Sequence, residues 1–205
     1  MPGGAFPLRF PAPAPSRARG AGLSRRALPL LLLMPASRPA RGEVWRHVIT
    51  EREGRITFSA RHLGLLRSEG EFRRFRTLLE LDPERPEATR IAGTVETGSA
   101  SVAYPGADEM LRSEAFFDSA RYPEALFEGV ALGAGRAWRF PIEGTLTLRG
   151  ISRPWLLEAR LLGREGGQAL FVAVGRLSRR AYGMVAERLL IGDEIVITIS
   201  VRVPV

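Results

Sequence analysis

Residues 140–154 read Phe140-Pro-Ile-Glu-Gly-Thr-Leu-Thr-Leu-Arg-Gly-Ile-Ser-Arg-Pro154. Large apolar side chains occupy even positions, at Phe140, Ile142, Leu146 and Leu148, and charged or polar side chains occupy the odd positions from 143 to 149. A period of two over this length indicates a β-strand with one face buried and the other in water. The stretch therefore predicts a strand over residues 138–149 that belongs to a one-sided sheet.

The same alternation recurs along the chain. Candidate strands cover residues 56–61, 72–81, 90–96, 127–131, 138–149, 155–162, 171–177 and 195–203, with proline and glycine turn signals between them. One-faced strands with few helices to cover them tend to close on themselves. We therefore expect an all-β fold, an eight-stranded antiparallel barrel with one or two short helices.

One stretch departs from the strand pattern. Asp108 is expected to cap a short helix in which Met110, Leu111, Ala115 and Phe116 recur at three-to-four spacing. The neighbouring pair Phe116-Phe117 would then plug or line one end of the barrel.

Small residues share the parity of the large apolar ones on several strands. They are Gly93, Gly129, Ala131, Gly144, Ala159, Ala173 and Gly175. Glycine in a strand marks either a bend or a close approach to the backbone. Small inward residues would ease barrel curvature, or they would leave an apolar space, and an eight-stranded barrel is wide enough for either solution.

The charge distribution separates a leader from the domain. All 30 basic residues are arginine, and the net charge is +8. Seven arginines and no acidic residue precede Glu43, so the remainder is nearly neutral and gives no reason to expect nucleic-acid binding. Ser24-Arg-Arg-Ala-Leu28, the apolar run 27–34 and small residues up to Ala40 predict an export signal that resembles the twin-arginine type.

This pattern predicts a leader over residues 1–42 and one domain over residues 43–205, in a periplasmic or secreted protein. The apolar run is too short to span a bilayer, which takes about 20 apolar residues. The alternatives are a start codon placed too early or a basic disordered tail.

The chain is poor in catalytic side chains. It has no cysteine and two histidines, His47 and His62, and no motif of a nucleophile, carboxylate pair or metal site accompanies them. We expect His62 to be a structural histidine at a strand end or, alternatively, to hold a polar head group.

Six arginines suggest local roles. The pairs Arg73-Arg74 and Arg179-Arg180 lack the interleaved aromatics of a nucleic-acid platform and are expected on solvated faces. Arg149 points away from Leu146 and Leu148 by parity, which favours an outer ion pair or a contact with a neighbouring loop. Arg153, beside Pro154, could reach a barrel mouth.

Six pieces of the chain resemble, in order, the motifs of the YceI-like family. They are Phe58-Ser-Ala-Arg-His-Leu-Gly64, Gly70-Glu-Phe-Arg-Arg-Phe75, Leu81-Asp-Pro83, Leu111 to Phe127 with its Leu-Arg-Ser and Arg-Tyr-Pro steps, Leu146 to Pro154, and Gly192 to Ile199. The resemblance covers roughly residues 44–203. It implies a lipocalin-like barrel that binds a polyisoprenoid chain, such as a quinone tail, in its lumen, with no cofactor, no metal and no enzymatic activity.

Two segments depart from the family pattern. Tyr104-Pro-Gly-Ala-Asp108 replaces the usual loop before the short helix, and Ala181 stands where an acidic residue is usual. The first change affects the expected mouth and any head-group preference, and the second is expected to remove a polar pairing with arginine.

The predicted ligand-binding residues lie in the lumen and at its mouth. They are Phe58, His62, Phe72, Ile91, Val95, Phe116, Phe117, Phe127, Phe140, Ile142, Leu146, Leu148, Phe171 and Ile197. The expected partner is an isoprenoid lipid or quinone. The sequence is compatible with either a monomer or a homodimer. The alternatives are a structural or interaction barrel whose interior is filled by side chains, and a hydrolase or isomerase that uses His62.

Overall fold

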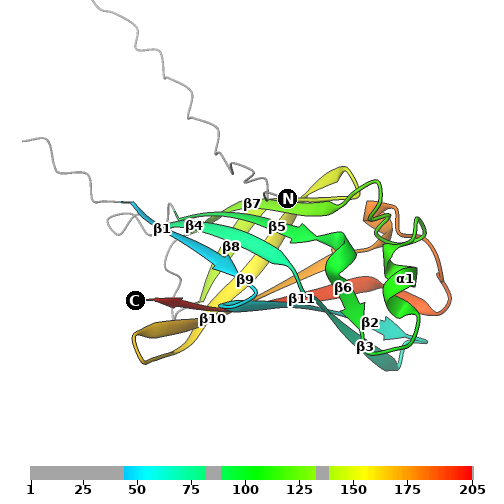
Figure 1. Cartoon of the computed structure of the whole chain (residues 1–205), viewed down its shortest axis with the longest axis horizontal. Helices are drawn as coiled ribbons and strands as arrows, with labels where there is room; N and C mark the ends of the chain where they lie inside the picture. The colour runs from blue at the N-terminus through cyan, green and yellow to red at the C-terminus, as the bar shows by residue number, and fades with distance from the viewer. Residues whose placement is uncertain (1–43, 82–88, 133–138, 205) are drawn as a thin grey trace, which may run out of the picture. The chain divides into compact units, whose positions relative to one another are not determined.

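The structure is a computed structural model that describes residues 44–81, 89–132 and 139–204. The predicted leader, residues 1–42, lies outside these residues. The described part falls within one compact unit, Gly42–Val205, and consists of antiparallel strands with very little helix (Figure 1). Its elements are β1 Trp45–Thr50, β2 Gly54–His62, β3 Leu66–Phe72, β4 Phe75–Leu81, β5 Arg90–Glu96, η2 Thr97–Ser99, β6 Ala100–Val102, α1 Ala107–Arg112, β7 Glu124–Ala131, β8 Arg139–Leu148, β9 Ile151–Glu165, β10 Gln168–Ser178, η4 Arg180–Tyr182 and β11 Ile191–Pro204.

The sheet has eleven strands, in the order β1-β4-β5-β7-β8-β9-β10-β11-β2-β3-β6, and not the eight predicted. The pairing explains the difference. β4 pairs with β1 while β3 pairs with β2, and β4 pairs with β5 while β3 pairs with β6. Three rows of the sheet are thus each broken into two strands. β11 pairs with β2, so the sheet curls round into a barrel-like fold.

The three missed strands, β1, β3 and β6, carry weak signals in the sequence. β3 places Ser68 and Gly70 between Arg67, Glu69 and Glu71, so no large apolar residue alternates in its middle. β6 is three residues long. The break beside it is held by Ser99, whose hydroxyl donates to the Glu96 carbonyl at 2.7 Å and accepts from the Arg74 amide at 3.1 Å.

The short helix begins two residues earlier than a cap at Asp108 would require. Gly106 occupies the N-cap position with φ 76°, and the helix runs from Ala107 to Arg112. Asp108 therefore lies in the first turn, where its carboxylate accepts from the Val102 amide at 3.1 Å and from the Ser101 hydroxyl at 3.2 Å. Ala115 and Phe116 lie beyond the helix, so the predicted cap and the predicted helix length were both wrong.

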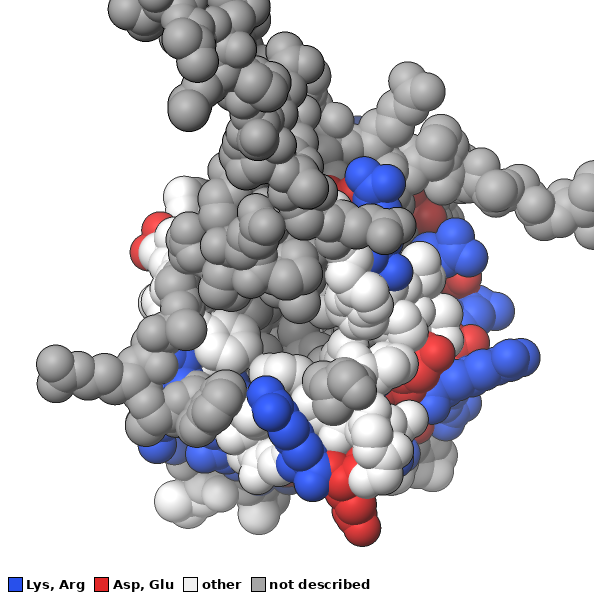
Figure 2. Space-filling model, turned by 90° about the vertical axis from the view of Figure 1, so that its left-hand side faces the viewer, with Lys and Arg blue, Asp and Glu red and all other residues white. Residues whose placement is uncertain are grey.

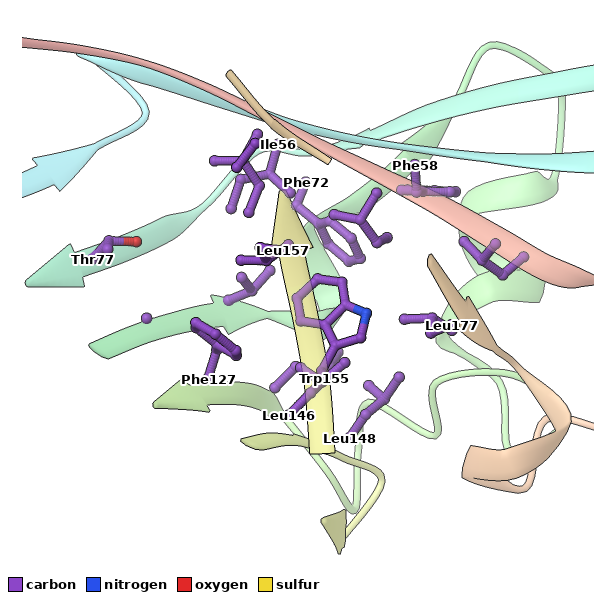
Figure 3. Close-up of a pocket in the computed structure, with 18 of the residues that line it drawn as sticks. Ile56, Phe58, Phe72, Thr77, Phe127, Leu146, Leu148, Trp155, Leu157 and Leu177 are labelled. Carbon is purple, nitrogen blue, oxygen red and sulfur yellow. The ribbon is translucent and has the colours of Figure 1, made fainter. Parts of the chain in front are cut away.

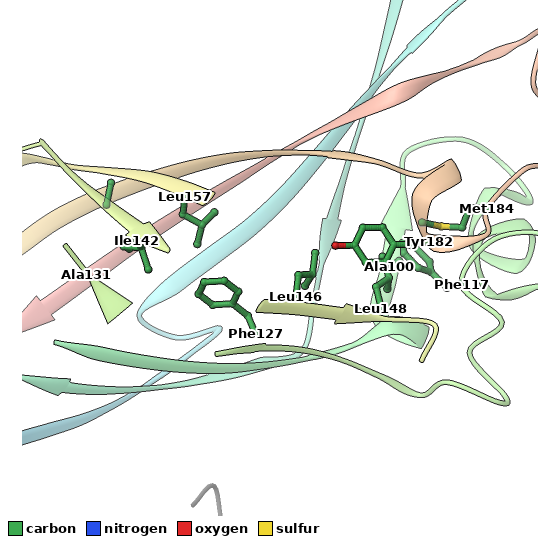
Figure 4. Close-up of a cluster of buried hydrophobic side chains, with 11 residues drawn as sticks. Ala100, Phe117, Phe127, Ala131, Ile142, Leu146, Leu148, Leu157, Tyr182 and Met184 are labelled. Carbon is green, nitrogen blue, oxygen red and sulfur yellow. The ribbon is translucent and has the colours of Figure 1, made fainter. Parts of the chain in front are cut away.

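Buried apolar side chains form two clusters inside the curled sheet. The larger extends from Ala131, Ile142 and Leu157 to Phe117, Tyr182 and Met184, which gather near α1 and η4 (Figure 4). The smaller contains Ile49, Ile56, Phe75 and Val203. We call the end of the domain that carries α1, η4 and the β2–β3 turn the α1 end (Figure 1).

Candidate functional site

A cavity of about 1520 Å³ lies inside the curled sheet, and every one of the eleven strands contributes to its wall. Its lining is apolar over most of its length, with Phe127, Leu146 and Trp155 among the side chains that project into it (Figure 3). The volume exceeds the 300–1,000 Å³ typical of pockets for drug-sized ligands. The space suits a long apolar molecule better than a compact polar one.

All fourteen predicted ligand-binding residues border this cavity. They are Phe58, His62, Phe72, Ile91, Val95, Phe116, Phe117, Phe127, Phe140, Ile142, Leu146, Leu148, Phe171 and Ile197. The two-residue period placed the strand residues there because successive side chains of a strand point to opposite faces. That these residues contact a ligand stays a prediction.

Aromatic rings lie against the glycines of the wall. A Cβ added at Gly129 or at Gly144 would lie 2.7 Å from the ring of Phe127, and a Cβ at Gly175 would lie closer still to the indole of Trp155. The glycines therefore admit aromatic rings of the same strand or of a neighbouring one close to the backbone. This arrangement explains why small and large residues share a face, and it keeps the rings along the wall.

Trp155, Leu157 and Leu177 also border the cavity, although they are not among the predicted ligand-binding residues. Their parity within 155–161 and 171–177 was a sufficient signal. Trp155 brings a polar atom to the wall, but its Nε1 donates to the Arg176 carbonyl at 2.8 Å. The indole is thereby satisfied by the backbone and presents its apolar surface to the lumen.

Arg179 corrects the prediction of a solvated pair, because it is only 2% exposed. Its Nε donates to the Gly192 carbonyl at 3.0 Å, and its two terminal nitrogens donate to Met184 and Ile191 at 2.8 Å each. Burial lowers the pKa of the guanidinium. Arg179 borders the cavity, but its donors fix the backbone of residues 184–192.

The other arginines of interest lie outside the cavity lining. Arg149 donates to the carbonyl of Phe116, which confirms the predicted contact with a neighbouring loop. Arg153 donates to the carbonyl of Ala181 at 2.9 Å. At this position, where the family usually has an acidic side chain, the arginine is therefore bonded by the backbone. Arg73 and Arg74 are exposed and pair with Glu71 and Glu96, as expected of a solvated face.

The cavity reaches the α1 end, where several exposed residues border it, and we call this part of its lining the mouth. His62, Leu63, Leu66, Tyr104, Met110 and Leu190 border it there. His62 ends β2 and is half-buried, a position that fits either a structural histidine or a head-group contact. On the opposite end, charged side chains of the described residues lie mainly toward the margin (Figure 2).

No three histidine, aspartate or glutamate side chains gather as a potential metal site within residues 44–81, 89–132 and 139–204. The same ranges contain no helix long and apolar enough to cross a bilayer.

The wall of the lumen presents few polar groups, so transferring an apolar ligand from water onto it is favourable. Large apolar cavities also hold water poorly, because a buried water needs about three polar partners. The lining therefore favours an apolar occupant.

Comparisons with known proteins agree with this geometry. The YceI-like domain matches residues 47–203. "Protein YceI" of Salmonella arizonae is 28% identical over 152 residues, which cover 72% of this chain and 79% of that protein.

Two solved structures share the fold. The crystal structure of Burkholderia cenocepacia BcnA matches with a TM-score of 0.67 and 18% identity, over 73% of this chain and 96% of that one. A polyisoprenoid binding domain from Saccharophagus degradans, implicated in plant cell wall breakdown, matches with a TM-score of 0.59 and 12% identity, over 78% and 98%. Since the family match spans most of the sequence, the chain belongs to the YceI-like domain family.

Proposed function

We propose that this chain binds a polyisoprenoid chain, such as the tail of an isoprenoid quinone or a polyprenyl lipid, in its lumen and acts as a carrier or sequestering protein. The observation that carries the proposal is the continuous apolar cavity of about 1520 Å³ to which all eleven strands contribute. The polyisoprenoid binding domain from Saccharophagus degradans supports it as a fold neighbour.

The energetics favour a long tail. Each buried CH₂ contributes roughly 0.8 kcal/mol, or about 4 kcal/mol for each five-carbon isoprene unit. Ordering the tail opposes binding by about 0.5–1.5 kcal/mol per immobilised flexible group. The apolar contribution is non-directional, so the wall would accept tails of several kinds. Head-group selectivity would depend on the polar residues of the mouth, His62 among them.

We further propose that binding involves no catalysis and no cofactor, and that residues 1–42 direct export to the periplasm or the medium. Support for export comes from the arginine-rich, acid-free leader with its short apolar run. Amino-terminal sequencing of the chain recovered from a periplasmic fraction would test it, and an intact leader on cytoplasmic protein would contradict it.

The main test is organic extraction and mass spectrometry of the protein purified from a bacterial host that makes isoprenoid lipids. We expect a prenyl-chain compound in stoichiometric amount. Ala173→Trp would extend an indole from the wall into the lumen and should abolish retention. Val174→Trp, which changes the next residue on the opposite face of β10, is the matched control.

An extract without prenyl lipid, from folded protein, would contradict the proposal. It would favour the alternative of a barrel that works through its outer surface. Equal retention by both tryptophan variants would place the bound lipid outside the lumen.

A further inference from the structure

Two leucine side chains at the α1 end are almost fully exposed. Leu65, in the β2–β3 turn, and Leu189, in the loop before β11, are each 92% exposed. Their neighbours Leu63, Leu66 and Leu190 are also exposed but border the cavity mouth. A ligand in the lumen could cover these three neighbours. It would not cover Leu65 and Leu189, which are not part of the cavity lining. Within the part of the chain that the structure describes, neither the core nor the lumen buries these two side chains.

The two loops hold these leucines in a defined arrangement. The Leu63 amide donates to the Leu190 carbonyl at 3.0 Å, which joins the β2–β3 turn to the loop. Leu63 adopts φ 46°, a left-handed conformation that costs a leucine free energy and that turns usually assign to asparagine or glycine. Backbone strain at an exposed apolar turn residue points to a functional constraint. Arg179 fixes the base of the loop through its bonds to Met184 and Ile191.

Arginines flank the leucines. Residues 61–67 and 185–190, which we call the rim loops, contain Arg61, Arg67, Arg188 and a single acid, Glu187. All four are exposed. Arg67 pairs with Glu69 at 3.2 Å, whereas Arg61 and Arg188 form no ion pair within 4.0 Å to any residue that the structure describes. Apolar tips beside free guanidinium groups match an interface where acyl chains meet anionic head groups.

We propose that the rim loops dock the α1 end on the surface of an anionic lipid bilayer, with Leu65 and Leu189 inserted at the acyl boundary and Arg61 and Arg188 at the head groups. Docking in this orientation turns the cavity mouth toward the membrane. An isoprenoid tail could then pass between bilayer and lumen without crossing water, a consequence that rests on the proposed function.

Flotation with lipid vesicles tests the docking. The full chain is mixed with vesicles of equal parts phosphatidylglycerol and phosphatidylcholine, and the vesicle-bound fraction is measured. Leu65→Ser/Leu189→Ser should lower the partition coefficient at least about tenfold, because burying a leucine contributes roughly 1.5–3 kcal/mol and each 1.4 kcal/mol is tenfold. Leu156→Ser/Leu162→Ser is the matched control, since both residues are exposed on β9 and neither borders the cavity.

The charge contribution is separable. Arg61→Gln/Arg188→Gln should weaken binding to the anionic vesicles by roughly fivefold per arginine, and it should leave binding to pure phosphatidylcholine unchanged. The basic leader is the same in every variant, so differences between variants report the rim loops. Circular dichroism of each variant checks that it is folded.

Flotation of the leucine variant at the wild-type level would overturn the proposal. If Leu65→Ser/Leu189→Ser abolished self-association of the protein but left flotation unchanged, the docking proposal would be overturned. The two leucines would then belong to an interface between copies of the chain. Lipid extraction from the same preparations separates the two hypotheses. Retained isoprenoid without vesicle binding refutes docking alone, and vesicle binding without isoprenoid refutes the proposed function alone.

Discussion

The lumen wall and the rim loops use the same residue type in opposite ways. Leu146 on β8 is 8% exposed, whereas Leu189 in a rim loop is 92% exposed. The wall leucine is buried by its strand parity and by contacts within the larger core cluster. The rim leucine has neither. Substitutions in the wall should therefore change the free energy of unfolding, whereas substitutions in the rim loops should change only binding to the lipid bilayer.

The largest effect is expected at Gly144 of β8, which pairs with Gly129 of β7. A Cβ there would lie 2.7 Å from the Cα of Gly129 and closer still to the Glu128 carbonyl oxygen. Backbone atoms cannot yield as a flexible side chain can, so Gly144→Val should lower the free energy of unfolding by more than about 3 kcal/mol. Urea unfolding followed by circular dichroism measures it.

Gly163→Val is the control for this prediction, because a Cβ at Gly163 would meet no atom within 4 Å. Equal stability of the two valine variants would show that the wall tolerates bulk at its glycines, and the contrast between wall and rim would lose its basis.

The next effect concerns the aromatic face of the wall. Phe127 is 9% exposed and packs edge-on against Trp155, with ring centroids 5.6 Å apart. Phe127→Ala should lower the free energy of unfolding by about 3 kcal/mol. Leu189→Ser, at an exposed site, should change it by less than about 0.5 kcal/mol. Thermal unfolding of both variants measures the two changes. A larger loss of stability in Leu189→Ser than in Phe127→Ala would contradict the division into wall and rim.

Much of the wall was predictable because strand parity is a local property that one sequence reveals. Phe140, Ile142, Leu146 and Leu148 all border the cavity, as their even spacing indicated. The strand count was less predictable, because β3 has no large apolar residue alternating in its middle and β6 is only three residues long. The pairing of Gly70 with Val102 also joins segments that no local pattern connects.

The mouth was much less predictable. Turn residues have no parity, so nothing in the sequence distinguished the exposed Leu65 from a core leucine. Arg179 was expected in water because arginine usually lies there. Its burial depends on carbonyls of Met184, Ile191 and Gly192, and the chain brings these carbonyls around it only in the folded loop.

Arg179 connects the two regions, since it borders the lumen and also holds a rim loop. Arg179→Met would leave several inward carbonyls without donors and should lower the free energy of unfolding by about 2 kcal/mol. It should also raise amide hydrogen exchange in residues 184–192. Arg180→Met is the control, because Arg180 is exposed and its ion pair with Asp193 spans 3.8 Å. Unchanged exchange in Arg179→Met would show that the loop holds its shape without the guanidinium.

The smallest effect is expected at Asp108, which ties α1 to β6 beside the mouth. The Val102 amide, with further help from the Ser101 hydroxyl and Arg112, lowers the pKa of the Asp108 carboxyl below its ordinary value of 3.8. A lowered pKa in the folded state gives stability that is present above the unfolded pKa and is lost as the pH falls through the folded one. Wild-type protein should therefore lose thermal stability below about pH 4, and Asp108→Asn should lose less over the same range.

Glu109→Gln removes an exposed carboxylate from the same helix and should keep the wild-type acid dependence. If Asp108→Asn kept it too, the acid sensitivity would belong to other carboxylates, and the mouth would be held by its backbone and Arg179 alone.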